Sequence, residues 1–245
     1  MSDASSGTSR MSAVGLVVRA AASILVVGLI LFGLFSARFV LPEGRTVRLN
    51  VGPRRILGTL VSVSLVAPAE EESAANEAIE AAFTHIREID GLMSFYADTS
   101  ELSRLNKAGT GNVSEDLFRV LAKAQEVSRL TGGAFDVTVR PLIRVWKEAA
   151  RKDALPTQAD LDAARALVSY THVTLAEGDR KVTLTKQGTT IDLAGIAKGY
   201  AVDAASAVLR GKGFGDFMVE AGGEIYCSGS KGPDAPWRIG VRDPR

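Results

Sequence analysis

An uncharged apolar run, AAASILVVGLILFGLFSA at residues 20–37, most constrains what this chain can fold into. The run has no polar stripe, so a helix formed by it would be apolar all round rather than amphipathic. Its 18 residues are just enough for a helix to cross the hydrocarbon core of a bilayer. The run therefore predicts a transmembrane anchor at 20–37, preceded by a cytoplasmic leader at 1–19.

A cleaved signal peptide is the alternative interpretation of the same run. Phe35, Ser36 and Ala37 precede Arg38, the first charged residue after the run, so a bulky phenylalanine stands where a cleavage site usually has a small residue. This position favours the anchor over the signal peptide. The flank after the run carries more arginines than the flank before it, which by the positive-inside rule would place the bulk of the chain in the cytoplasm. A domain that follows the anchor can translocate regardless of its charge, so the sequence leaves the orientation open.

Composition indicates that the rest of the chain is globular. The 245 residues are 46% hydrophobic and 23% charged, enough for one or two domains with a proper core. The sum of 29 Lys and Arg against 28 Asp and Glu leaves a net charge of +1, which is not the basic footprint of a nucleic-acid-binding protein. The single cysteine, Cys227, excludes an internal disulfide and a thiolate metal cluster.

From residue 57 onward, hydrophobic periodicity predicts one continuous α/β-type (α+β) domain without a linker. Alternation predicts strands in the segments GTLVSVSLVAP, HVTLAEGDRKVTLT, DFMVEAGGEIYCSG and PWRIGVRD, the second of them a hairpin. Helical spacing and capping residues predict helices over 70–93, from Ser114 to the glycines at 132–133, after Thr157 with Asp160, and over about 197–210.

Lys198 is unusual because it stands in the first turn of the last predicted helix, IDLAGIAKGYAVD. The helix dipole is positive there, so a cation is unfavourable unless something negative faces it. Small residues around it would let an anionic ligand approach the backbone. The alternative is that Asp192 caps the helix while Lys198 extends into solvent or pairs with Asp203, a poorly aligned i, i+5 spacing.

Three further stretches depart from ordinary core or surface patterns. MSFYADTSELSRLN, at 93–106, places Tyr96 and a polar turn between helical segments, as a helix end followed by a short capped helix would. TGGAFDVTVRPLIRVW, at 131–146, places Asp136 in a β-rich run, where it either serves a ligand or pairs with a nearby arginine. VEAGGEIYCSG, at 219–229, has glycines inside a strand pattern, which indicates a bulge or a nearby ligand.

Taken together, FYADTSELSRLN, TGGAFDVTVRPL, IDLAGIAKGYAVD, AGGEI and PWRIGVRDP resemble the ApbE-like family of FAD:protein FMN transferases in order and spacing. The resemblance covers about residue 54 to the last residue and implies an ApbE-like flavin transferase domain over 50–245. It implies an enzyme that binds FAD as its substrate and uses Mg²⁺. Such an enzyme transfers FMN to a Thr or Ser hydroxyl of a target flavoprotein and releases AMP.

The resemblance also implies site residues. Gly195 would offer its backbone carbonyl to the metal, and Leu57 stands where the family usually has Met in a Met-Gly-Thr turn. The residues implied to bind the flavin nucleotide are Leu57, Tyr96, Ala134, Phe135, Asp136, Asp192 and Lys198. No catalytic residue is assigned, and the two histidines, His85 and His172, are expected to be structural.

The sequence departs from the family pattern at the end of the chain. Family members continue well past the segment Asp243-Pro244-Arg245, with a His-bearing segment and later metal ligands, so we expect a C-terminally incomplete domain and metal site. The alternative functions are a non-catalytic membrane-anchored FAD-binding protein or an inactive fragment of such an enzyme. Because ApbE-like proteins act outside the cytoplasmic membrane, the resemblance implies an inner-membrane protein with residues 38–245 on the periplasmic side. No nucleic-acid partner is expected.

Overall fold

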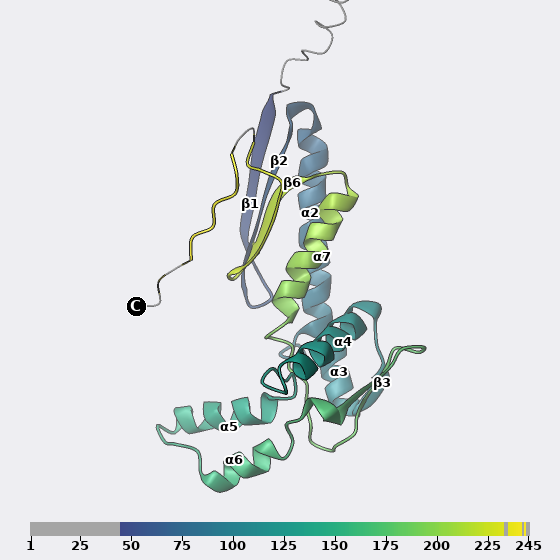
Figure 1. Cartoon of the computed structure of the whole chain (residues 1–245), viewed down its shortest axis with the longest axis vertical. Helices are drawn as coiled ribbons and strands as arrows, with labels where there is room; N and C mark the ends of the chain where they lie inside the picture. The colour runs from purple at the N-terminus through teal and green to yellow at the C-terminus, as the bar shows by residue number, and fades with distance from the viewer. Residues whose placement is uncertain (1–44, 233–234, 242, 244–245) are drawn as a thin grey trace, which may run out of the picture. The chain divides into compact units, whose positions relative to one another are not determined.

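The computed structural model describes residues 45–232, 235–241 and 243, which are coloured in Figure 1. The predicted leader at 1–19 and anchor at 20–37 lie outside these residues. Among the helices that are described, none is both long and apolar enough to cross a membrane. The chain from Thr46 onward forms one compact unit.

A four-stranded antiparallel sheet carries the core. Its strands lie in the order β1-β2-β6-β7, with bounds β1 Thr46–Ile56, β2 Thr59–Pro68, β6 Asp216–Ala221 and β7 Glu224–Ser228. Alternate residues of β2, among them Val61, Val63 and Leu65, are fully buried, because successive side chains of a strand point to opposite faces. All pairings are antiparallel, so the mixed fold is of the α+β type.

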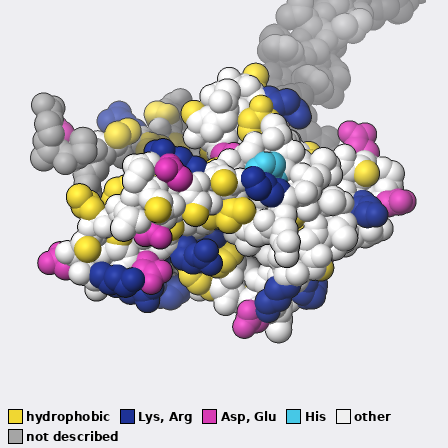
Figure 2. All heavy atoms as spheres, turned by 90° about the horizontal axis from the view of Figure 1, so that it is seen from below, with side chains coloured by type: hydrophobic (Ala, Val, Ile, Leu, Met, Phe, Trp, Pro, Cys, Tyr) yellow, Lys and Arg dark blue, Asp and Glu magenta, His cyan; other side chains and the backbone are white. Residues whose placement is uncertain are grey.

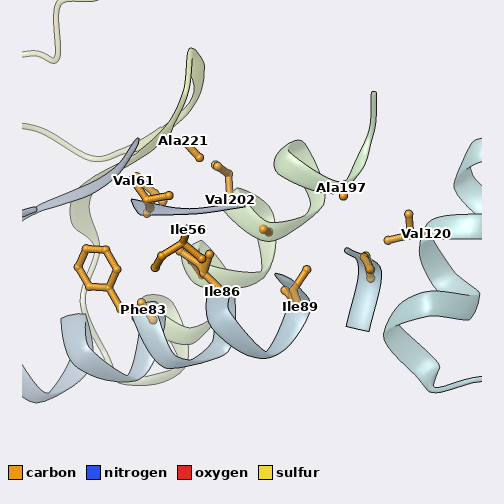
Figure 3. Close-up of a cluster of buried hydrophobic side chains, with 14 of the residues drawn as sticks. Ile56, Val61, Phe83, Ile86, Ile89, Val120, Ala197, Val202 and Ala221 are labelled. Carbon is orange, nitrogen blue, oxygen red and sulfur yellow. The ribbon is translucent and has the colours of Figure 1, made fainter. Parts of the chain in front are cut away.

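Two helices, α2 (Glu72–Met93) and α7 (Ala197–Gly211), pack beside each other and against this sheet (Figure 1). Figure 3 shows Phe83, Ile86 and Ile89 of α2 in the same buried cluster as Ile56 and Val202. Their spacing of three residues puts them on one face of the helix. Burying each such side chain contributes about 1.5–3 kcal/mol, so the α2 stripe is a main source of stability.

The remaining elements include a second, smaller sheet. A three-stranded sheet has the order β3-β5-β4. The bounds are η1 Ala69–Glu71, α3 Glu101–Ala108, β3 Thr110–Asn112, α4 Glu115–Leu130, α5 Arg140–Arg151, α6 Gln158–Arg165, η2 Tyr170–His172, β4 Val173–Ala176 and β5 Lys181–Leu184. On the face shown in Figure 2, basic and acidic side chains are interspersed with hydrophobic ones.

The capped helices confirm the sequence prediction. The side-chain oxygens of Ser100, Ser114 and Thr157 accept hydrogen bonds from backbone N–H groups three residues later. These bonds satisfy donors that the first turn of a helix leaves free. The hairpin β4–β5 and the end of α2 at Met93 are also where the pattern predicted them.

Three strand-like patterns form other structures than their residues suggested. The run after Asp136 contains no strand and enters α5, since Pro141 suits the first turn and apolar residues recur on one helical face. Gly222 and Gly223 form the turn of the β6–β7 hairpin with φ of 61° and 103°, which glycine adopts without strain, so the predicted bulge is wrong. The alternative of a ligand near these glycines stays a prediction. In PWRIGVRD, the described residues hold only an isolated bridge from Pro236 to Ser230.

The sequence prediction also missed a strand, β1. Its side chains alternate between exposed and half-buried along an edge of the sheet, and several of them are arginines. A charged edge strand lacks the apolar alternation by which strands are recognised.

Candidate functional site

A pocket of about 170 Å³ opens where the β1–β2 turn, the end of α2 and the start of α7 meet. Four residues expected to bind the flavin nucleotide, namely Leu57, Tyr96, Asp192 and Lys198, line it. The full lining is Leu57, Gly58, Asp90, Met93, Ser94, Phe95, Tyr96, Asp192, Leu193, Ala194, Ala197 and Lys198. Tertiary structure thus brings together segments that are far apart in the sequence.

Asp192 is held by a buried ion pair at the pocket. Its Oδ2 lies 2.9 Å from Nη1 of Arg140, and the two side chains are 8% and 17% exposed. Its Oδ1 accepts a hydrogen bond from the N–H of Ala194, and its own N–H donates to the carbonyl of Val137. The N-cap of α7 is Ile196, without a side-chain hydrogen bond, so the alternative in which Asp192 caps this helix is wrong.

Arg140 was not among the predicted site residues. Its guanidinium carbon lies 3.6 Å from the ring centre of Phe95 and 5.6 Å from that of Tyr96, distances at which a cation is attracted to an aromatic face. Tyr96 is 79% exposed. Its pKa is lowered, first by hydrogen bonding to Arg140 and then by the charge of Lys147. Arg140 therefore links Asp192 to Phe95 and Tyr96, which together are called the aromatic rim of the pocket.

Lys198 is the second residue of α7, as predicted, but it neither extends freely into solvent nor pairs with Asp203. Its Nζ contacts Oε1 of Glu224, the first residue of β7. The other oxygen of Glu224 is buried and has no hydrogen-bond partner among the described residues. A carboxylate of the chain itself therefore offsets the cation at the helix start.

The Ala134–Asp136 segment does not line the pocket. The ring of Phe135 packs on Gly195: a Cβ atom added to Gly195 would lie 3.3 Å from Cε2 of Phe135. The carboxylate of Asp136 accepts three hydrogen bonds, from the N–H and hydroxyl of Thr138 and from the N–H of Tyr170. Among the described residues, Asp136 therefore has no arginine partner, and it does not line the pocket.

These contacts predict that Asp136→Asn lowers the free energy of unfolding by about 1–2 kcal/mol, because the new amide group points a donor at a backbone donor. Urea denaturation measures the change. Asp179→Asn, in the exposed β4–β5 turn, is the matched control and should leave stability unchanged. An unchanged stability of Asp136→Asn together with weaker flavin retention would instead assign Asp136 to the ligand.

A second pocket of about 320 Å³ lies on the α4 side of the same segment. Its lining is Val120, Lys123, Val127, Gly195, Ile196, Gly199, Tyr200, Asp203 and Glu224. The hydroxyl of Tyr200 donates to Asp116 across 2.5 Å, and burial raises the pKa of Tyr200. Residues 192–203 therefore help to line both pockets.

Among the described residues, no three His, Cys, Asp or Glu side chains gather into a group that could hold a metal ion. Mg²⁺ commonly takes one or two carboxylates and completes its coordination with waters and substrate phosphates, so the Mg²⁺ site that the resemblance implies stays a prediction. The Gly195 carbonyl would be one ligand of that site. His85 pairs with Glu88 on the surface of α2, and His172 lies 3.4 Å from the Thr189 hydroxyl; neither histidine lines the two pockets.

Asn106 is a further residue that the sequence reasoning missed. Its side chain accepts from the N–H of Ile191 across 2.7 Å and donates to the carbonyl of Ile191 across 2.9 Å. The side chain therefore replaces a strand partner for the segment that carries Asp192. The motif SELSRLN contains this asparagine, but its partner lies 85 residues away in the sequence.

Comparison with known proteins adds an independent observation. The model of the ApbE family matches residues 57–245. An FAD:protein FMN transferase of Vibrio cholerae is 39% identical over 166 residues, which cover 65% of this chain and 48% of the relative. The one of Haemophilus influenzae is 35% identical over 167 residues, covering 65% of this chain and 48% of the relative.

Solved structures show the same similarity. The flavin transferase ApbE from Vibrio cholerae superposes with a TM-score of 0.69 at 31% identity, covering 82% of this chain and 65% of that one. An ApbE protein from Thermotoga maritima gives 0.68 at 30% identity, covering 82% and 64%. This chain spans about half the length of the Vibrio and Haemophilus relatives.

Proposed function

The chain belongs to the ApbE family, and on that premise we propose that it acts as an FAD:protein FMN transferase. The acceptor would be a Thr or Ser hydroxyl of a target flavoprotein. Its oxygen forms a bond to the FMN phosphorus while the pyrophosphate bond breaks, AMP leaves with the bridging oxygen, and the hydroxyl proton is released to solvent. The observation that carries the proposal is the pocket that Lys198, at a helix start, lines together with Leu57 and Tyr96.

The chemistry of the lining supports a flavin nucleotide. Leu57 and the ring of Tyr96 offer apolar and aromatic surface to a flavin ring, while Lys198 and the first N–H groups of α7 suit a pyrophosphate. A pocket of about 170 Å³ is smaller than the roughly 300–1,000 Å³ of ordinary ligand sites, so it would hold only part of FAD. The second pocket, which Gly195 and Gly199 help to line, offers room for the rest of the FAD molecule.

Magnesium enters the proposal through the family resemblance. The metal would neutralise charge on the phosphates, and the Gly195 carbonyl is the one ligand proposed from the described residues. The roles assigned to this chain's residues do not depend on it: Lys198 binds the anion, and Arg140 holds Asp192 and the aromatic rim in place.

Replacing Lys198 tests the proposal. Lys198→Ala is expected to weaken FAD binding by roughly 10–100-fold, since a charge-assisted hydrogen bond to phosphate is lost. The side chain is only 29% exposed and its Nζ pairs with Glu224, so the free energy of unfolding should also fall, by about 1–2 kcal/mol, and affinity is measured well below the unfolding temperature. Isothermal titration calorimetry with FAD measures the affinity, and release of AMP on adding a Thr-bearing target measures transfer.

Lys212→Ala, which removes a lysine just past the other end of α7, is the matched control and should bind FAD normally. Equal affinity of Lys198→Ala and the unmodified chain would reject the anion site. FAD binding by the unmodified chain without AMP release would favour the non-catalytic alternative.

The location of the domain is part of the proposal. We infer that 20–37 anchors the chain in the inner membrane with residues 38–245 on the periplasmic side, because the apolar run suffices for insertion and family members act there. Alkaline phosphatase is active only after export, so its fusion behind residue 60 should be active. An expressed but inactive fusion would place the domain in the cytoplasm.

A further inference from the structure

Leu57 has an unusual backbone conformation for its residue type. With Gly58 it forms the two-residue turn between β1 and β2, where Ile56 pairs with Thr59. Its φ is 55°, in the left-handed region that Gly and Asn adopt readily and that apolar L-residues avoid. Among the described residues, the other non-glycine residues with positive φ are Asp153 and Arg180, and both are polar. Leu57 alone of the three lines the pocket around Lys198.

Asp90 occupies an unfavourable position for its charge. It lies in the last turn of α2, a turn that contains no basic residue, where the negative end of the helix dipole disfavours a carboxylate. Its Oδ2 accepts a hydrogen bond from the N–H of Leu57 across 3.1 Å, and Asp90 also lines the pocket. This hydrogen bond therefore joins a leucine in a backbone conformation that leucine avoids to a carboxylate at a helix end that disfavours negative charge.

Neither the helix nor the hairpin explains this pair. Asn at position 57 and Lys at position 90 would both suit their local structure better. The preceding residues, Ile56 and Ile89, lie in one buried cluster, which brings the turn and the helix end together (Figure 3). Backbone strain that the surrounding structure maintains tends to occur at functional sites.

We propose that Asp90 is a positioning residue: by accepting the N–H of Leu57, it holds Leu57 in the left-handed conformation, so that the leucine side chain forms the apolar wall against the flavin ring. This inference rests on the proposed function for the identity of the ligand. The acceptor oxygen carries the role, whereas the negative charge does not.

Four variants of the full chain, purified in detergent, separate this role from general stabilisation. Asp90→Ala removes the acceptor and should raise the dissociation constant for FAD roughly tenfold. Asp90→Asn keeps an acceptor oxygen and should bind nearly normally. Leu57→Met keeps an apolar wall and should retain affinity. Leu57→Asn relieves the backbone strain but removes the apolar wall. It should therefore lose affinity for FAD, while its thermal midpoint stays near or above that of Leu57→Met.

Hydrogen exchange of the Leu57 amide without FAD supplies the second measurement. Exchange should be faster in Asp90→Ala than in the unmodified chain and in Asp90→Asn. Unchanged FAD affinity in Asp90→Ala, or an equal loss in Asp90→Asn, would overturn the positioning role. If the unmodified chain binds no FAD, the proposed function fails, and exchange alone decides: an equal rate in Asp90→Ala would then overturn the role of Asp90.

Discussion

Replacing Arg140 with methionine is expected to lower the free energy of unfolding by about 3 kcal/mol and to abolish flavin retention. The substitution keeps the length and apolar stem of the side chain but leaves the Asp192 carboxylate, which is 8% exposed, without its counter-ion. It also removes the cation that lies over Phe95 and beside Tyr96. Both the acidic side and the aromatic rim of the pocket should therefore lose their positions.

Urea denaturation and flavin fluorescence measure the two effects of Arg140→Met. Arg144→Met is the matched control, because Arg144 is exposed on the next turn of α5 and should leave both quantities unchanged. The double variant Arg140→Met, Asp192→Asn should be more stable than the sum of the single changes predicts, since the unpaired charge is then absent. Wild-type stability in Arg140→Met would show that the ion pair is not required.

Asn106→Asp should also cost about 2–3 kcal/mol of stability and weaken FAD binding. The aspartate has the same shape and still accepts from the N–H of Ile191, but it cannot donate to the Ile191 carbonyl. A carboxylate oxygen would then face a carbonyl oxygen in a partly buried place. Since Ile191 directly precedes Asp192, the loosened segment should displace one side of the pocket.

The stability of Asn106→Asp is measured by urea denaturation and its FAD affinity by calorimetry. Asn112→Asp provides the control, because Asn112 is exposed in β3 and should tolerate the charge. If Asn106→Asp unfolds at the same urea concentration as the unmodified chain, the paired hydrogen bonds to Ile191 contribute little and this account of the SELSRLN motif is wrong.

Local features of the fold were predictable because their causes lie within a few residues. Ser100, Ser114 and Thr157 cap helices through bonds to the third following residue, and the apolar stripe of α2 is visible in its spacing. The run after Asp136 misled the prediction because AFDVTV has β-forming residues, whereas Pro141 and the packing of the following turns start α5.

The candidate site was predictable only in part. The resemblance brought Leu57, Tyr96, Asp192 and Lys198 together, and all four line one pocket. It did not show that Asp136 bonds backbone groups instead. No local sequence pattern predicts the partners of these residues. Arg140 and Asp192 lie 52 positions apart in the sequence, and Leu57 and Asp90 lie 33 positions apart.

The sequence by itself determined where helices are capped, which faces are apolar, that a cation stands at the start of α7, and which family the motifs resemble. Only the tertiary structure decided what those polar groups contact: Glu224 for Lys198, Arg140 for Asp192 and the N–H of Leu57 for Asp90. The physical reason is that capping and amphipathicity depend on neighbours within one or two turns, whereas a buried charge takes whichever partner the packing of distant elements brings within reach.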